Sequence, residues 1–194
     1  MTDRTPLHPG DPFPALTMTL PGGRTVHLPD DLAGRFGVVL FYRGSRCPYC
    51  NAQLSAFHRA LDGLAEVDAP VVAPPVDDEA ATRDLIARRG LRFPVGHSAD
   101  AAAVADVTGT CVYRDPPFLQ SSGFVLDRGG RSSSASTPAA PSGGSSRKRW
   151  SASSATCADT PRPARPDERQ RTQHPADGAD VYARVRDLRN RCLK

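Results

Sequence analysis

The sequence predicts an α/β fold in which helices flank a central sheet. Short apolar runs alternate with longer stretches whose apolar residues recur at helical spacing, and this order favours parallel strands joined by crossover helices. The continuous apolar run Gly37–Tyr42 is typical of a strand buried on both faces. A chain of 194 residues is also long enough for one domain with a substantial core.

Each expected element follows from its local pattern. A run of turn residues, Pro21-Gly22-Gly23, separates two short strands that we expect to form a hairpin. After the buried strand, leucine and phenylalanine residues repeat at three- and four-residue spacing and predict a helix from Pro48 to about Glu66. The other expected elements are hairpin strands at Thr17–Leu20 and Thr25–Leu28, a strand at Pro70–Ala73, a helix at Asp78–Arg89 closed by Gly90, an extended piece at Phe93–Val95, a helix at Ala99–Val107, and a strand at Phe124–Leu126 with a turn at Asp127–Gly130.

Charge and composition divide the chain into two unlike parts. Residues 1–130 hold 12 basic and 15 acidic residues, a net charge of −3, whereas residues 131–194 hold 13 and 6, a net charge of +7. The second part opens with a Ser-, Ala-, Pro- and Gly-rich stretch and has few large apolar residues, so it buries too little surface to offset the entropy of ordering it. We therefore predict a folded domain at 1–130 and a basic, low-complexity, disordered tail at 131–194.

The composition also bears on location and partners. The first residues lack the apolar core of a signal peptide, and no apolar stretch approaches the roughly 18 residues of a membrane span. Five cysteines, an odd number, argue against a secreted disulfide framework. Arg147-Lys148-Arg149 beside Trp150 is interpreted as a solvated charge run. We expect a cytoplasmic protein with no membrane and no nucleic-acid partner.

The motif CPYC at residues 47–50 stands between the buried strand and the following helix. Cys47 would lie at the start of that helix, where unpaired N–H groups and the positive end of the dipole favour a thiolate. Arg43 and Arg46 add positive charge nearby. Cys50 lies one turn further along and can close a disulfide with Cys47. The pattern predicts a redox centre whose site residues are Cys47, Cys50, Arg43 and Arg46.

A pair of cysteines at this spacing is also half of a zinc site. A structural zinc site needs four ligands, but the other cysteines stand singly and the five histidines form no HxxxH pair. His58 and His97 are candidate proton donors that we interpret as surface or packing residues. The acidic run 77–79 is interpreted as the charged first turn of a helix. Redox chemistry is favoured, and we expect neither a metal nor another cofactor.

These motifs resemble those of the AhpC/TSA, or redoxin, group, which is the peroxiredoxin-like branch of the thioredoxin fold. The resemblance spans about residues 10–130 and rests on Gly10-Asp11-Pro12-Phe13-Pro14, on Phe41-Tyr42-Arg43-Gly44 before the CPYC motif, on Phe93-Pro94 with Ser98-Ala99-Asp100, and on Gly123-Phe124-Val125-Leu126-Asp127. It implies a thioredoxin-like fold with a mixed sheet and antioxidant, thiol-dependent activity. It also implies that Cys47 is the attacking thiol and Cys50 its resolving partner.

The resemblance leaves two substrate classes open, a small-molecule peroxide and a protein disulfide. Leu40 and Gly44 stand where typical peroxiredoxins have Pro and Thr, and Ser121 stands near the place of their arginine. Arg43 or Arg46 is a possible substitute for that charge. CPYC is also the dithiol pattern of glutaredoxins, and disulfide exchange needs only an activated and a resolving thiol. The implied reductant is a thioredoxin- or glutaredoxin-like protein or a low-molecular-weight thiol.

A thioredoxin-like fold needs one more strand and a closing helix after the turn at Asp127–Gly130. If the tail is disordered, both are missing, and the alternative to an enzyme is a non-catalytic or defunct redoxin domain. In a GC-rich gene, valine codons read one base downstream give serine, so we hypothesise that the tail from Ser132 is an out-of-frame product. Sequencing of the locus around the Arg131 codon tests this. Near the end, Val181, Val185, Leu188 and Cys192 share one helical face and predict a short helix that docks on an apolar surface.

Overall fold

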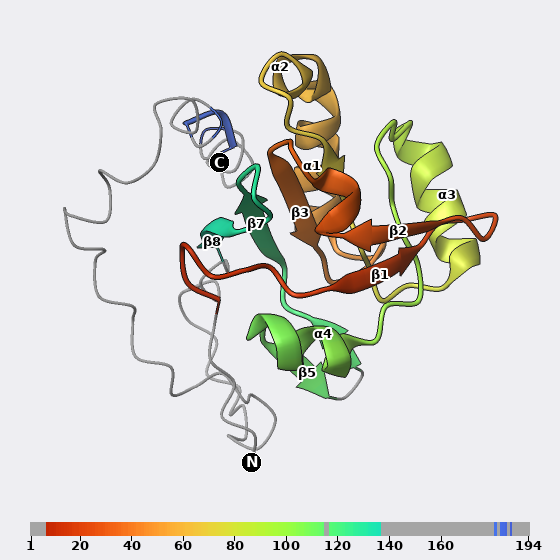
Figure 1. The fold of residues 1–194 in the computed structure, drawn as a ribbon. Helices are drawn as coiled ribbons and strands as arrows, with labels where there is room; N and C mark the ends of the chain where they lie inside the picture. Colours follow the sequence, from red (N-terminus) through yellow and green to blue (C-terminus); the bar gives the residue numbers. More distant parts are fainter. Residues whose placement is uncertain (1–6, 115–116, 137–180, 182, 186, 188–194) are drawn as a thin grey trace, which may run out of the picture.

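The computed structural model describes residues 7–114, 117–136, 181, 183–185 and 187. At its centre lies a four-stranded mixed sheet with the strand order β4-β3-β7-β8 (Figure 1). Strand β3 pairs in parallel with β4 and antiparallel with β7, and β7 pairs antiparallel with β8. The strands are β3 (Gly37–Phe41), β4 (Val71–Val72), β7 (Ser122–Leu126) and β8 (Ser132–Ser136).

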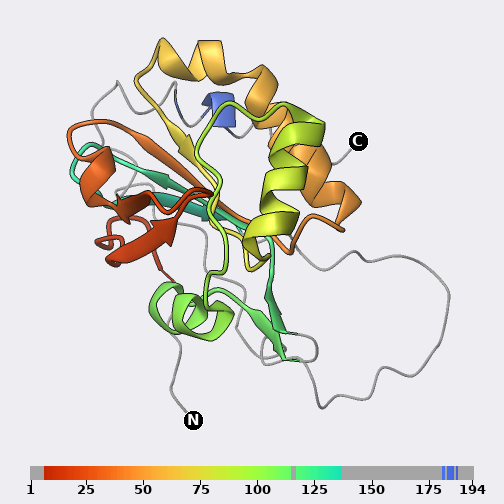
Figure 2. The same ribbon diagram turned by 90° about the vertical axis from the view of Figure 1, so that its right-hand side faces the viewer.

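Both faces of the sheet are covered, which explains the unbroken apolar run of β3. Val38, Leu40 and Tyr42 belong to the core on one face, and Val39 and Phe41 to the core on the other. Figure 2 shows the sheet between these two layers. The first face carries α1 (Pro48–Arg59), α2 (Leu61–Ala65) and α3 (Glu79–Arg89); the second carries the hairpin of β1 (Leu16–Thr19) and β2 (Thr25–Leu28), the short helix η1 (Asp30–Leu32), α4 (Ala101–Thr108) and the hairpin of β5 (Val112–Arg114) and β6 (Pro117–Leu119).

The structure confirms the predicted α/β fold and most of its elements. Asp78 caps α3 by accepting a hydrogen bond from Ala81 N–H, and Gly90 ends the helix with a φ of 61°. One prediction was wrong in detail, because the single helix expected from Pro48 to Glu66 is divided into α1 and α2 at Ala60. The apolar repeat continues across this break because residues of both helices stay packed on the same core.

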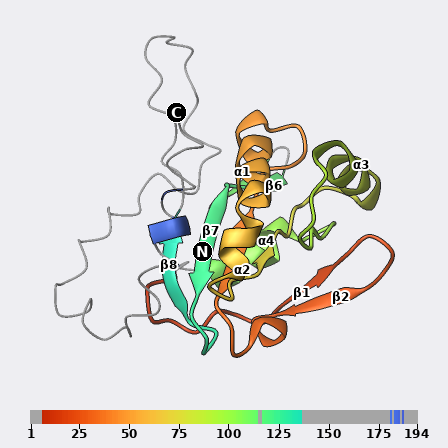
Figure 3. The same cartoon turned by 90° about the horizontal axis from the view of Figure 1, so that it is seen from above.

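Strand β8 corrects the prediction that the sheet lacks its last strand. It begins directly after the predicted turn, in which Gly130 N–H donates to Asp127 O, and it pairs with β7. At its start, Ser132 also exchanges backbone hydrogen bonds with Gly10 and Asp11 on the opposite side. Backbone groups rather than large side chains hold a strand in a sheet, so the Ser-rich composition did not prevent pairing. Figure 3 shows β8 on one side of the molecule, with α3 on the other.

A helical segment near the C-terminus corrects the prediction that the closing helix is missing. Residues 181, 183–185 and 187 are helical, and Val181 is fully buried in the core beside α1 and α2. Val185 packs against the same core, and the Arg184 guanidinium donates to Gly63 O at 3.0 Å. The predicted docking of the apolar helical face on the domain is therefore confirmed at Val181 and Val185. Leu188 and Cys192, and the tail from 137 to 180, lie outside the described residues.

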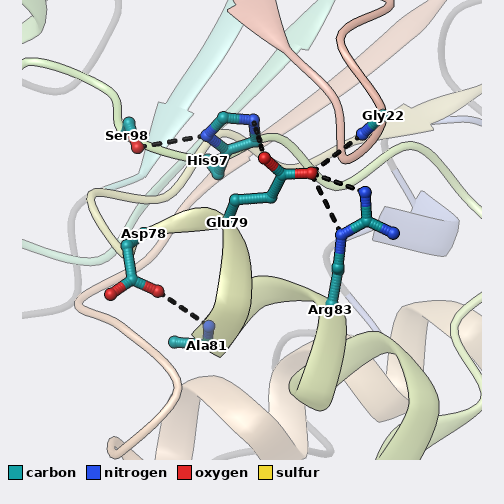
Figure 4. Close-up of polar contacts among 7 residues, drawn as sticks. All are labelled: Gly22, Asp78, Glu79, Ala81, Arg83, His97 and Ser98. Atoms are coloured by element: carbon teal, nitrogen blue, oxygen red, sulfur yellow. Dashed lines mark hydrogen bonds and ion pairs between the residues drawn. The ribbon is translucent and has the colours of Figure 1, made fainter.

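Glu79 joins three segments of the chain (Figure 4). Its Oε1 accepts hydrogen bonds from the backbone N–H of Gly22, in the β1–β2 turn, at 3.0 Å and from Arg83 Nη2 at 2.6 Å. His97 Nε2 lies 4.0 Å from Oε2, and His97 Nδ1 lies 3.1 Å from Ser98 Oγ. The carboxylate therefore links the hairpin to α3 and to the segment before α4.

We expect Glu79→Gln to lower the melting temperature at pH 7 but not at an acidic pH at which Glu79 is protonated in the folded chain. The hydrogen bonds from Arg83 and Gly22 lower the pKa of Glu79 below its ordinary value of 4.5, so the ionised form stabilises the fold above that pKa. The benefit disappears as the pH falls through the lowered pKa. Thermal unfolding followed by circular dichroism at both pH values measures the difference. Asp84→Asn, which removes one exposed ion pair with Arg88, is the control and should cause a smaller change; equal losses at both pH values for Glu79→Gln would contradict the expectation.

Candidate active site

The CPYC motif lies at the carboxyl edge of the sheet, where β3 ends. Cys47 is the N-cap of α1, with an extended backbone (φ −84°, ψ 111°), and Pro48 occupies the first helical position. The turn before it closes through a hydrogen bond from Cys47 N–H to Gly44 O. Gly44 has a φ of 128°, a conformation that residues with a side chain rarely adopt. The predicted order of strand, turn and helix is confirmed.

The two cysteines of the motif lie in contact. Cys50 Sγ is 2.7 Å from Cys47 Sγ, and Cys50 N–H donates to Cys47 Sγ at 3.3 Å. Both are free thiols, and Cys47 is half-buried whereas Cys50 is only 2% exposed. A disulfide has an S–S bond of about 2.05 Å, so a shift of less than about 1 Å would bring the sulfurs to bonding distance.

Burial gives Cys50 a different proton affinity from that of an ordinary thiol. Desolvation is the largest cause and, together with the hydrogen bond to Cys47, raises the pKa of Cys50 to about 12, although a backbone hydrogen bond from Arg43 acts in the opposite direction. Cys50 therefore carries its proton at neutral pH. A protonated Cys50 donates to Cys47 Sγ, so Cys47 is the acceptor, and it is also the less buried of the two thiols.

The two arginines predicted for the site differ in their surroundings. The Arg43 guanidinium lies over the aromatic pair of β5 and β6, 4.5 Å from the ring centroid of Phe118 and 5.5 Å from that of Tyr113. Its charge acts on Cys50, whose pKa it lowers slightly against the larger effect of burial. Arg46 is exposed on the turn directly before Cys47. Cation–π contact thus orients Arg43, while Arg46 faces solvent.

Ser121 occupies the place near which the related group has an arginine. It is 8% exposed, and its hydroxyl donates to Gln53 Oε1 on α1 at 3.2 Å. The residue therefore fastens α1 to the start of β7 and brings no charge. Arg43, which lies against Phe118 of the preceding strand, and the exposed Arg46 are the arginines of the turn before Cys47.

Asp77 and Asn51 hold the turn before Cys47, and the sequence reasoning did not identify either. Asp77 Oδ2 accepts a hydrogen bond from Ser45 N–H at 2.6 Å, and Asn51 Nδ2 donates to Ser45 O at 2.8 Å. The sequence did contain a signal for Asp77. This residue follows β4, and because β3 and β4 are parallel neighbours, the residues after their carboxyl ends lie at the same edge of the sheet.

Tyr42 lies beneath the motif and is fully buried. Burial raises its pKa well above the ordinary value, and the charges of Asp77 and Cys50 act in the same direction. The phenol is therefore neutral throughout the physiological pH range, and its hydroxyl has no hydrogen-bond partner among the described residues. Tyr42 contributes bulk and a neutral hydroxyl beneath Cys50 but no negative charge.

The other candidate residues lie apart from the thiols or have different roles. His58 is eleven residues after Cys47, at the far end of α1, about 16 Å along the helix axis. His97 contacts Glu79 and Ser98 instead. The acidic residues 77–79 have three different roles. Asp77 bonds to the turn before Cys47, Asp78 caps α3, and Glu79 contacts Gly22. Only the last two of these residues fit the predicted first turn of a helix. No group of three or more His, Cys, Asp or Glu side chains in the described ranges is placed to hold a metal ion.

Known protein families and structures share this architecture. The AhpC/TSA family matches residues 9–123, more than half of the chain. BcpB from Mycobacterium tuberculosis, a peroxidoxin, is 20% identical, with a TM-score of 0.61 over 68% of this chain and 86% of that one. A PrxQ mutant from Xylella fastidiosa is 17% identical, with a TM-score of 0.62 over 70% and 89% of the two chains.

A third structure is the bacterioferritin comigratory protein of Xanthomonas campestris, described for its alkyl peroxide reduction activity. It is 20% identical, with a TM-score of 0.58 over 71% of this chain and 89% of that one. No curated protein matches the chain in sequence. Among the described residues, no helix is both long and apolar enough to span a membrane. The thioredoxin-like fold with its dithiol turn and the match over residues 9–123 together show that the chain belongs to the AhpC/TSA family.

Proposed function

We propose that the chain is a thiol-dependent oxidoreductase in which Cys47 attacks a peroxide or a disulfide and Cys50 resolves the product. The observation that carries the proposal is the 2.7 Å contact between a half-buried Cys47 sulfur at the N-cap of α1 and the buried Cys50 sulfur. Helix N-termini favour a thiolate, which is the nucleophilic form. The contact supports the resolving role of Cys50, because its thiol is within reach of the Cys47 sulfur.

With a peroxide, the Cys47 thiolate attacks one oxygen of the O–O bond. Cys47 becomes a sulfenic acid, and the other oxygen leaves as an alcohol or water after taking a proton. Cys50 then loses its proton and attacks the Cys47 sulfur, which forms the disulfide and releases water. With a disulfide substrate, the same attack gives a mixed disulfide and one free thiol, and Cys50 releases the second thiol. In both cases an external dithiol, or two monothiols, returns Cys47 and Cys50 to the reduced state.

Three further features support this proposal. Family membership makes thiol chemistry on peroxides the expected activity. The Xanthomonas campestris protein, which shares the fold, is described as reducing alkyl peroxides. Two thiols in contact can form and break one disulfide, which is the redox change that the reaction needs. The proposed external reductant is a thioredoxin- or glutaredoxin-like protein or a low-molecular-weight thiol.

The substrate class is tested by turnover of the purified full chain. We expect thiol-dependent consumption of at least one of hydrogen peroxide, an organic hydroperoxide and a model disulfide, because one attacking and one resolving thiol suffice for all three. Each substrate is supplied separately with thioredoxin and thioredoxin reductase, and then with glutathione and glutathione reductase, while NADPH oxidation is followed and the rate without the chain is subtracted. The ratio of kcat/KM values among the substrates identifies the preferred one. Absence of turnover with every substrate by a folded, fully reduced chain would reject the proposal.

A further inference from the structure

We propose that Asp77 is a positioning residue for the dithiol site, which holds the turn 43–46 so that Cys47 caps α1 against Cys50. The proposal rests on the proposed function for its importance in turnover, but the geometry that it concerns is measured independently. Asp77 belongs to the connection between β4 and α3, so its side chain reaches the site from a different segment of the chain.

The Asp77 carboxylate contacts the turn at two neighbouring residues. Oδ2 accepts the Ser45 N–H at 2.6 Å, a short hydrogen bond to a charged acceptor. Oδ1 lies so close to Gly44 that a Cβ at that position would be 2.8 Å from it, nearer than real Cβ contacts allow. The glycine, with its φ of 128°, is therefore both conformationally required and packed against this carboxylate.

The backbone of Asp77 is held by the segment that precedes α4. Its backbone oxygen accepts a hydrogen bond from Ser98 N–H at 2.6 Å, and Ser98 has a left-handed backbone with a φ of 55°. Ala99 N–H donates to Pro75 O at 3.0 Å in the same region. The segment that precedes α4 thus supports the loop that carries Asp77, and the loop in turn supports the turn before Cys47.

The carbonyl group of the same residue, Ser45, is held from α1. Asn51, which is 7% exposed, donates from Nδ2 to Ser45 O at 2.8 Å. Ser45 is therefore bonded at its N–H by Asp77 and at its C=O by Asn51, which fixes the peptide planes on both sides of the residue. Cys47 follows two residues later, so loss of either bond lets the chain that carries Cys47 move relative to Cys50.

The test measures how strongly the site favours its disulfide. The reduced chain is equilibrated with glutathione disulfide, so that Cys47 and Cys50 lose two protons and two electrons as one glutathione disulfide becomes two glutathione molecules. We expect Asp77→Ala to reduce the equilibrium constant for disulfide formation about tenfold, because the two sulfurs meet less often. Asp77→Asn retains an oxygen acceptor at the same place and should restore most of the constant. Asp77→Glu should resemble the alanine variant, because the longer side chain cannot fit between the loop and Gly44.

Asp78→Ala is the matched control. It removes the N-cap of α3, which lies next in the chain and accepts from Ala81 N–H at 2.8 Å, and should lower the melting temperature without changing the equilibrium constant. If Asp77→Ala does not fold, the comparison of Asp77→Asn with Asp77→Glu decides. An unchanged constant in both Asp77→Ala and Asp77→Glu overturns the positioning role. Because the assay follows a single equilibration and needs no catalytic turnover, absence of turnover by the wild type with every substrate would reject the proposed function alone.

Discussion

Replacement of Cys47 by serine is expected to abolish turnover, with a decrease in kcat/KM on the order of 10³-fold or more. Serine retains the shape of the N-cap and can still accept the hydrogen bond from the N–H of residue 50, so α1 should form as before. What disappears is the sulfur that accepts an oxygen or forms a mixed disulfide. The measurement is steady-state reduction of the preferred substrate, with circular dichroism to show that the variant is folded.

Replacement of Cys50 by serine should have a different effect, and it is the matched control. Cys47 remains able to react once, so one equivalent of substrate is consumed per chain, and the reaction then stalls with a sulfenic acid or mixed disulfide on Cys47. Mass spectrometry of the Cys47 peptide detects that product. Turnover by Cys47→Ser at the wild-type rate would show that the reaction does not use this site. Full turnover by Cys50→Ser with a dithiol reductant would show that the reductant attacks Cys47 directly.

Replacement of Val181 by aspartate is expected to destabilise the fold by about 3 kcal/mol or more. Val181 is fully buried in the core beside α1 and α2, and a carboxylate placed there loses its hydration without a charge partner. This is a large part of the roughly 5–15 kcal/mol that stabilises a typical domain. Urea denaturation followed by far-UV circular dichroism measures the change.

The control for this experiment lies on the same helical segment. Ala183 is exposed, so Ala183→Asp adds the same charge at the surface and should change stability by no more than about 0.5 kcal/mol. Equal stability of Val181→Asp and the wild type would show that the C-terminal segment does not dock on the domain in solution. A loss confined to Val181→Asp would show that the basic tail supplies a structural element of the fold.

The sequence predicted the local parts of the site because each depends on neighbouring residues. The apolar run of β3, the proline after Cys47 and the spacing of the two cysteines are all readable within a few residues. Asp77 was missed because its role depends on the pairing of β3 with β4, which brings together residues about thirty positions apart. Burial of Cys50, and hence its raised pKa, likewise depends on the packing of α1 on the sheet.

The errors at the end of the domain have a different physical cause. A composition poor in large apolar residues argues against a packed core, but β8 is held by backbone hydrogen bonds, and the helical segment contacts the core through Val181 and Val185. The alternative of a defunct domain depended on a missing strand and a missing helix. The described residues include strand β8 and helical residues near the C-terminus. The reading-frame hypothesis stays a prediction that sequencing of the locus decides.

The hydrogen bonds between the lead-in to β1 and the start of β8 also bear on self-association. An uncovered edge strand offers unpaired N–H and C=O groups to any other extended chain and is a common starting point for aggregation. Here the lead-in to β1 bonds to the first residues of β8 through Gly10 N–H, Ser132 O, Ser132 N–H and Asp11 O. The lead-in thereby occupies the outer hydrogen-bonding groups at the start of β8, where another extended chain could otherwise add as a strand.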